Sequence, residues 1–157
     1  MGEFFGAFKE LRDKVAAIDQ HVLINTIVSR PEYRDFIIKR NTEVQLFELN
    51  IDSEGVKLAA NRGGYADLTL LIAEQEGRPK RGRNRIDLRD SGKYYESHAV
   101  SIPNLKADYF EMLSDPLKGD TDLIEDWGPV LGLDSVSMEL LALFIAEAFI
   151  PLFIEEL

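Results

Sequence analysis

The sequence contains no cysteine and only two histidines, and these shortages remove whole classes of site. Without cysteine the chain forms no disulfide, thiolate zinc site, iron–sulfur cluster or cysteine nucleophile, which favours an intracellular place of folding. Neither His21 nor His98 has a further ligand at a metal-binding spacing. We therefore expect no metal site and no cofactor.

The sequence also lacks the short motifs that carry common enzyme chemistries. Ser91 lies between Asp90 and Gly92, which resembles a nucleophile. The esterase elbow, however, requires a glycine two residues to either side of the serine, where this chain has Arg89 and Lys93. The glycines have the spacing of neither a phosphate-binding loop nor a dinucleotide fingerprint. The prediction is a protein that is not an enzyme.

A calcium-binding loop is imitated but incomplete. Asn50, Asp52 and Glu54 precede Gly55 in the manner of such a loop. The bidentate glutamate required at its twelfth position is replaced by Asn61. We expect a solvated turn here.

Acidic residues outnumber basic ones, 28 to 18, so the 157 residues have a net charge of -10. That charge argues against broad binding to DNA or to anionic membranes, since phosphate contacts need lysine and arginine. The N-terminal residues, MGEFFGAFKELRDK, mix charges into an apolar run and do not predict a signal peptide.

One long apolar run near the C-terminal end, MELLALFIAEAFIPLFIEEL, has the length of a membrane span. Glu139 and Glu147 interrupt it and no lysine or arginine flanks it, so we expect no membrane. We expect instead a helix buried on nearly all sides, packed against another subunit as well as its own core. Pro151 predicts a kink or an interruption.

The first half of the chain is predicted to be helical. No glycine occurs between residues 7 and 54. A helix from about 3 to 29 is indicated by apolar residues at three-and-four spacing, namely Phe4, Phe8, Leu11, Val15, Ile18 and Val22. A second helix is expected from Pro31, with Ser29 near its capping position, to about Leu49. A third is expected over 65–76, closed by Gly77.

The second half predicts a small sheet and two helices. The segments SHAVSI and DYFEMLS predict antiparallel strands joined by a turn at Pro103 and Asn104. A short helix capped by Asp120 or Thr121 is expected before the apolar helix, which begins near 134–137. The fold class is therefore α+β, with long N-terminal helices, a small antiparallel β-sheet in the middle and an apolar C-terminal helix. We expect a single domain, 1–157, with these parts: helical, about 1–77; basic loop, about 78–85; β part, about 86–115; C-terminal helices, about 120–157.

Positive charge is concentrated in residues 78–93, called the basic stretch below. It contains Arg78, Lys80, Arg81, Arg83, Arg85, Arg89 and Lys93. Three interpretations are open: a solvated loop, a nucleic-acid contact flanked by Tyr94 and Tyr95, or an arm that docks on the acidic surface of a neighbouring copy. The net negative charge favours docking over nucleic acid.

Three segments between Gln45 and Leu133 carry a resemblance to a known family. Residues 45–47, QLF, end a long helix and precede the turn DSEG. The segment IDLRDSGKYYESHAV supplies Leu88, Asp90, Ser91, Gly92, Tyr94 and Tyr95, with Ser97 just beyond. The segment SDPLKGDTDLIEDWGPVLGL supplies Leu123, Trp127, Gly128, Leu131, Gly132 and Leu133. In these features the chain resembles the neck and tail-completion (head–tail connector) proteins of tailed bacteriophages.

The resemblance implies a structural virion protein with no active site. Such a protein is a subunit of a homo-oligomeric ring at the head–tail junction, joining portal and tail around the DNA path. The implied partners are further copies of the chain, neighbouring portal, connector or tail proteins, and the packaged DNA passing through. The implied location is the virion, after assembly in the host cytoplasm.

Elementary electrostatics is compatible with a ring. An acidic lining lets DNA slide without sticking, and head-to-tail closure needs two complementary patches on each subunit. The basic stretch and the acidic remainder would supply those patches. The alternative is an accessory nucleic-acid-binding protein that uses the basic stretch as its contact.

Overall fold

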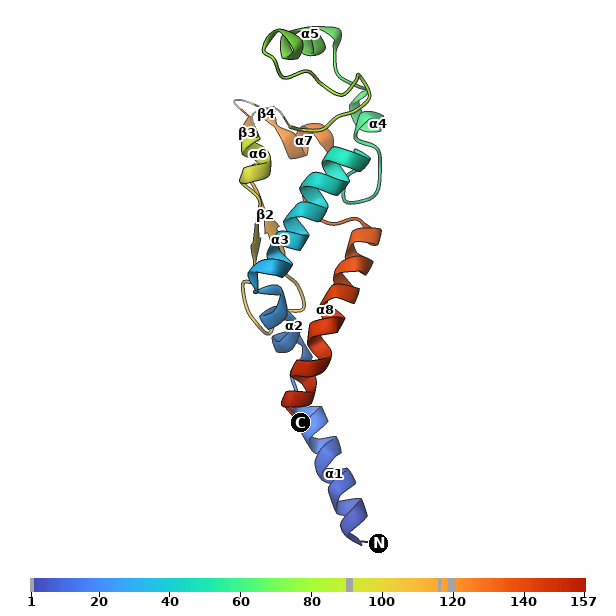
Figure 1. Cartoon of the computed structure of the whole chain (residues 1–157), viewed down its shortest axis with the longest axis vertical. Coiled ribbons are helices and arrows are strands. Elements are labelled where there is room, and N and C mark those ends of the chain that lie inside the picture. The colour runs from blue at the N-terminus through green and yellow to red at the C-terminus, as the bar shows by residue number, and fades with distance from the viewer. Residues whose placement is uncertain (1, 90–91, 116, 119–120) are drawn as a thin grey trace.

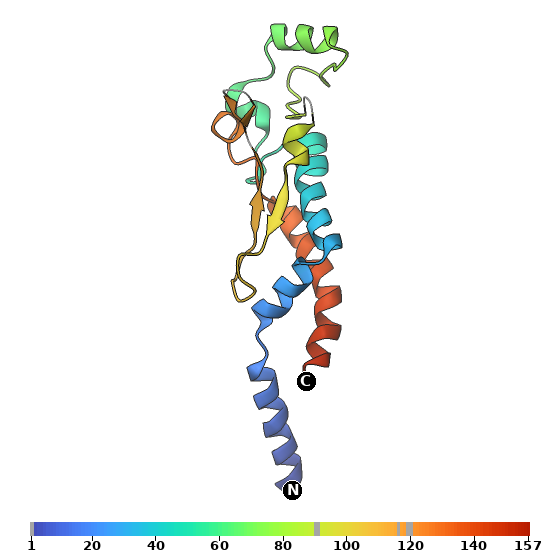
Figure 2. The same cartoon turned by 90° about the vertical axis from the view of Figure 1, so that its left-hand side faces the viewer.

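The computed structural model of the chain describes residues 2–89, 92–115, 117–118 and 121–157. Helices lie along the long axis of an elongated molecule, and a β-hairpin covers one side of them (Figure 1, Figure 2). The predicted α+β fold, with its N-terminal helices, small antiparallel sheet and apolar C-terminal helix, is confirmed.

The N-terminal helical part is broken where one helix was expected. Helix α1 spans Gly2–Ala17 and α2 spans Gln20–Val28. Asp19 leaves the helical conformation between them, and its carboxylate accepts hydrogen bonds from the amides of His21 and Val22. An aspartate that caps a new helix competes with continuation of the old one, which explains the break. As a result α1 projects beyond the body of the molecule (Figure 1, Figure 2).

The next two helices form one continuous rod. Helix α3 spans Pro31–Lys39, with proline at its first position as predicted, although Arg30 rather than Ser29 is the residue before it. It passes directly into a π-helix, η1, at Arg40–Leu49. The rod ends at Asn50, whose left-handed backbone (φ 53°) stops the helix at the predicted position.

Two buried amide side chains connect the rod to the segment that leads into the last helix. Nδ2 of Asn41 donates to the carbonyls of Val130 and Gly132, at 3.0 and 2.7 Å. Nε2 of Gln45 donates to the carbonyl of Gly132 at 2.9 Å, and its Oε1 accepts from the amide of Asp134 at 2.9 Å. These four bonds hold residues 130–134 against the middle of the rod.

The predicted β part is also found. Strand β1, Ala99–Ser101, pairs antiparallel with β2, Glu111–Leu113, with Val100 opposite Met112. The Asn25 side chain in α2 donates to the carbonyls of Leu105 and Ala107, which ties the hairpin loop to the helices. A second short pair, β3 (Leu117–Lys118) and β4 (Thr121–Asp122), was not predicted.

Four short helices complete the upper end of the molecule: α4 (Leu58–Arg62), α5 (Asp67–Gln75), α6 (Lys93–Glu96) and α7 (Leu123–Trp127). Helix α5 lies within the predicted range, and Gly77 follows it with φ 71°. The predicted cap of α7 is wrong, because Asp122 accepts the amides of Ile124 and Glu125. Asp120 lies outside the described residues.

The calcium-like segment is a turn whose tip, Glu54 and Gly55, is exposed as expected, but its first residues are not solvated. Asn50 and Asp52 are both buried. The Asp52 carboxylate accepts from the amides of Glu54 and Val56, so it is satisfied within its own turn. The adjacent Ser53 amide donates to the carbonyl of Pro129, which docks the turn on the chain before α8.

Two hydrophobic clusters lie along the axis. The upper cluster packs the end of the rod against the short helices and contains Leu46, Leu58, Ile86, Leu88, Tyr94, Leu123 and Val130. The lower cluster packs α2, α3, the hairpin and the last helix together and contains Val28, Ile37, Val100 and Leu141.

The last helix, α8, spans Ser135–Glu155 and runs through Pro151 without interruption. One side packs on α2 and α3, where Leu141 is buried and the Phe144 ring stacks on Tyr33 at 4.3 Å. The chain alone does not provide the expected burial on nearly all sides, and the expected packing of α8 against another subunit stays a prediction. Six large apolar side chains are exposed: Val136, Met138, Leu140, Leu143, Ile150 and Ile154.

By length and composition α8 is also long and apolar enough to cross a membrane. Only 11% of its most apolar window is buried inside the molecule. The buried side of α8 nevertheless packs on α2 and α3, and Glu139 and Glu147 are exposed. That the protein binds no membrane stays a prediction.

The buried amides lead to a first testable prediction. Asn41→Leu and Gln45→Leu would each leave buried carbonyl or amide groups without a partner, at a cost of about 1–3 kcal/mol. We expect each variant to lower the free energy of unfolding by about that amount in urea denaturation. Glu43→Gln, exposed on the same helix, is the control. Equal stability of all three variants would contradict the role assigned to these amides.

Candidate functional site

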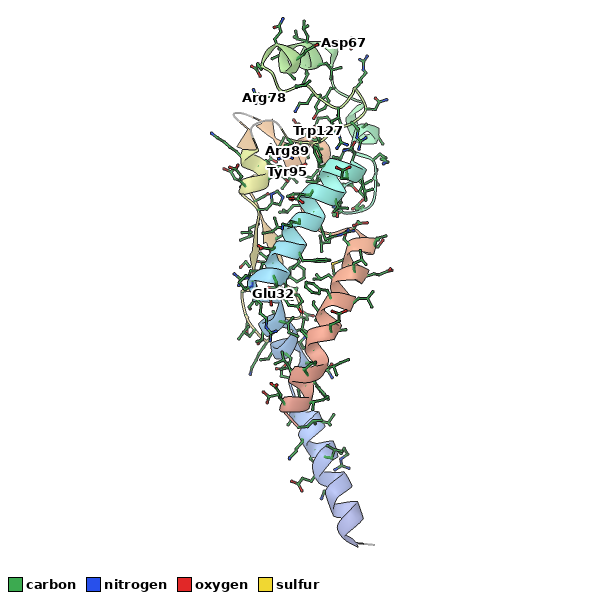
Figure 3. All side chains as sticks on the ribbon, in the orientation of Figure 1. Glu32, Asp67, Arg78, Arg89, Tyr95 and Trp127 are labelled. Carbon is green, nitrogen blue, oxygen red and sulfur yellow. The ribbon has the colours of Figure 1, made fainter. Side chains whose placement is uncertain are left out.

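The basic stretch lies at the end of the molecule opposite α1, around the C-terminal end of the rod. Figure 3 shows Arg78 and Arg89 at this end, together with Asp67, Tyr95 and Trp127. The basic stretch therefore occupies a defined place on the fold.

Two arginines of the stretch bind the last carbonyls of η1. Arg81 donates to the carbonyl of Phe47 at 3.3 Å, and Arg85 donates to the carbonyl of Glu48 at 3.0 Å. Both guanidinium groups also lie within 4 Å of the Glu48 carboxylate. The final carbonyls of a helix have no intrahelical partner and carry partial negative charge, so cations stabilise this end. Part of the basic charge is thus used inside the chain.

The basic stretch also contains a buried ion pair, formed by Lys80 and Asp87. Nζ of Lys80 is 3.5 Å from Oδ1 of Asp87, and the two side chains are only 8% and 6% exposed. Oδ1 also accepts from the Tyr65 hydroxyl at 3.0 Å and from the Arg89 amide at 3.1 Å. The Tyr95 hydroxyl donates to the Asp87 carbonyl.

The phenols beside this ion pair stay protonated. Burial, and then the neighbouring Asp87 carboxylate, raise the pKa of Tyr65 and the pKa of Tyr95 well above the usual range. Both groups therefore act as hydrogen-bond donors near neutral pH. Oδ1 and the backbone carbonyl of Asp87 interact with donors from three segments, an arrangement that suits a structural role.

The remaining basic side chains are exposed: Arg78, Arg83, Arg89 and Lys93. Arg83 pairs with the exposed Asp67 at 3.1 Å, and Arg78 pairs with Glu76. The Arg89 guanidinium lies 5.4 Å from the centre of the Phe47 ring, over which Arg81 also stacks at 4.3 Å. Surface pairs of this kind contribute little to stability. Arg83 is therefore the matched contrast to the two arginines that bind η1.

The segment IDLRDSGKYYESHAV (86–100) forms the junction between the rod and the sheet. Leu88 has a left-handed backbone (φ 49°), and Gly92 (φ 86°) precedes α6, where Lys93 is exposed. Asp90 and Ser91 lie outside the described residues. The buried Tyr94 belongs to the upper cluster, and burial raises its pKa to about 12.

The other residues that carry the resemblance also have structural contacts. Ser97 donates to the Tyr94 carbonyl at 2.6 Å and accepts the Asp115 amide at 2.9 Å, joining α6 to the end of the hairpin. Trp127 lies against Tyr65, edge to face, and Gly128 ends α7 with φ 85°.

His98 is buried under α6. Its Nδ1 bonds the Tyr94 carbonyl at 2.8 Å, whereas Nε2 is buried without a hydrogen-bond partner. Burial lowers the pKa of His98 below its ordinary value, so the folded protein holds the neutral ring. No group of three metal-ligating side chains gathers anywhere in the part of the chain that the structure describes.

Two residues of this site were not predicted from the sequence. Asp87 gave no signal, because alternation with the apolar Ile86 and Leu88 would place its side chain on the opposite, solvent-facing side, whereas all three residues are buried. Phe47, the stacking partner of two arginines, gave no signal because the contact spans 34 residues.

No family model matches the sequence, and neither a curated protein nor a solved structure matches the chain at a significant level.

The two classes of arginine can be separated by mutation. Arg81→Gln and Arg85→Gln remove charge from the end of η1, and we expect each to lower the free energy of unfolding by about 0.5–1 kcal/mol. Arg83→Gln should change it by less than about 0.5 kcal/mol, because the pair it breaks is exposed. Thermal denaturation followed by circular dichroism measures the stability of all three variants. A loss with Arg83→Gln alone would overturn the assignment.

His98 predicts a pH dependence of stability. The unfolded chain takes up a proton near pH 6.5, whereas the folded chain resists it, so the free energy of unfolding falls as pH drops from 7.5 to 5.5. The slope is at most about 1.4 kcal/mol per pH unit for one group. We expect His98→Gln to flatten this slope and the exposed His21→Gln to leave it intact. Urea denaturation at several pH values tests this, and an equal slope in both variants would contradict it.

Proposed function

We propose that the chain is a structural virion protein, a subunit of a homo-oligomeric ring at the head–tail junction of a tailed bacteriophage. In this role it joins portal and tail around the DNA path. The resemblance over residues 45–133 supports the virion assignment, and the structure adds a reason for self-assembly.

The observation that carries the proposal is the uncovered side of α8. Burying one leucine or isoleucine contributes about 1.5–3 kcal/mol, and α8 leaves six large apolar side chains exposed along one helix. A surface of that kind marks an interaction site. A subunit built to be covered by neighbours has this property.

The charge of the chain fits the same role. A net charge of -10 gives a surface over which DNA passes without lasting contact. Most of the arginines in the basic stretch have acidic or carbonyl partners in their own chain, which leaves less free charge for phosphate. We therefore favour the ring over the nucleic-acid alternative. Absence of enzymatic activity remains part of the proposal.

The test is the mass and shape of the purified chain. We expect light scattering to give a whole multiple of 17.8 kDa, and negative-stain electron microscopy to show a ring with a central channel. A monomer at every accessible concentration would contradict the proposal. So would salt-sensitive binding to a DNA duplex, measured by fluorescence anisotropy, that Arg83→Ser weakens.

A further inference from the structure

The exposed residues of α8 have a regular spacing. Val136, Leu140, Leu143, Ile150 and Ile154 are separated by four, three, seven and four residues, which is the 3.5-residue repeat of a helix–helix seam. Leu143, Ile150 and Ile154 are 66%, 60% and 61% exposed. We call this row the α8 stripe. Its form predicts another helix as its partner.

One position in the α8 stripe is polar. Glu147 fills the gap between Leu143 and Ile150, and Glu139 flanks the stripe. Pro151 has no amide hydrogen, so the Glu147 carbonyl does not receive the hydrogen bond that a helix normally supplies. A partner helix therefore needs both apolar surface and positive charge. No lysine or arginine follows Lys118 in the chain, so that charge comes from elsewhere.

Helix α1 has the complementary pattern. Leu11 and Val15 are 48% and 40% exposed, and the sequence continues the same four-and-three spacing to Phe4, Phe8 and Ile18. On a helical wheel Arg12 and Lys14 flank this row on its two sides. Among the described residues Arg12 pairs with the neighbouring Asp13 at the surface, a weak interaction.

The position of α1 leaves its row available. The helix extends away from the body in both views and has no extensive contact with the other described helices or strands (Figure 1, Figure 2). Its 16 residues span about 24 Å and the 21 residues of α8 about 32 Å, so α1 covers most of the α8 stripe.

Other occupants from the same chain fit less well. Two α8 stripes paired with each other in parallel would bring Glu147 carboxylates together. Helix α5 also exposes apolar side chains, Leu68, Leu71 and Ile72, but it is nine residues long and has Asp67 and Glu74 beside them. Like charges would then face the carboxylates of α8.

We propose that α1 of one copy packs along the α8 stripe of a second copy, with Arg12 and Lys14 beside Glu139 and Glu147. Each subunit offers α1 at one place and α8 at another, so the contact either closes reciprocally between two copies or propagates head to tail into a ring or a filament. The inference names the contact for the self-association in the proposed function and rests on that part of it.

Charge reversal in the full chain tests the pairing. Lys14→Glu should weaken self-association about tenfold in sedimentation velocity, and combining it with Glu147→Lys should restore much of the loss. Lys9→Glu, the same change on the opposite side of α1, is the matched control and should have little effect. Equal behaviour of Lys9→Glu and Lys14→Glu would overturn the contact.

The absence of cysteine permits a direct test of which copy supplies α1. Single-cysteine chains with Leu11→Cys or Val15→Cys are mixed with chains carrying Leu143→Cys or Ile150→Cys and oxidised. We expect disulfide-linked dimers of the two different chains, and none when Lys9→Cys replaces the α1 partner. A crosslink that forms only within a doubly substituted chain would mean that α1 folds back on its own α8, which overturns the inference.

The remaining outcomes separate this inference from the proposed function. A ring in electron microscopy that is insensitive to Lys14→Glu overturns the α1–α8 contact and leaves the ring intact. A charge-sensitive, crosslinked closed dimer supports the contact and overturns the ring. Flotation of the monomeric chain with phosphatidylcholine vesicles, abolished by Leu143→Glu, would show lipid on the α8 stripe and overturn the contact.

Discussion

The fold depends on two amide side chains in the middle of the rod. Asn41 and Gln45 bind the carbonyls of Val130 and Gly132 and the amide of Asp134, and Asp134 in turn caps α8. The start of the last helix is thereby held at one point and in one rotation about its axis. This rotation decides which side of α8 packs on α2 and α3 and which side is left uncovered. The surface that we assign to assembly is thus set by polar contacts in the interior.

The concentration of arginine in an acidic chain has a similar local cause. The end of η1 presents free carbonyls and the Glu48 carboxylate, and Asp87 is buried nearby. A loop that crosses this region needs positive charge to be stable there, whatever else it touches. Tyr65 and Tyr95 add hydrogen bonds to Asp87. The stretch therefore has a structural reason for its composition before any partner is considered.

The elements of the fold that depend on short-range patterns could be predicted from the sequence. Apolar spacing located the rod and α8, and β-preferring residues located the hairpin that pairs Val100 with Met112. The prediction from apolar spacing failed at Asp19, because the capping of a new helix outweighed the continuous apolar pattern. The sequence could not identify the partners of Arg81 and Arg85, which lie 34 and 37 residues away. Hydrophobicity alone likewise showed that α8 is apolar on most sides but not what covers each side.

The break between α1 and α2 has a consequence for how an assembly would form. Each helix is complete on its own side of Asp19, so α1 can change direction without unfolding α2 or disturbing either hydrophobic cluster. A joint made by such an arm forms and separates without refolding the subunit. Subunits that joined in the wrong number would then exchange until a closed, strain-free arrangement is reached. Error correction of this kind needs a reversible arm on a rigid body, and the break at Asp19 would separate the two.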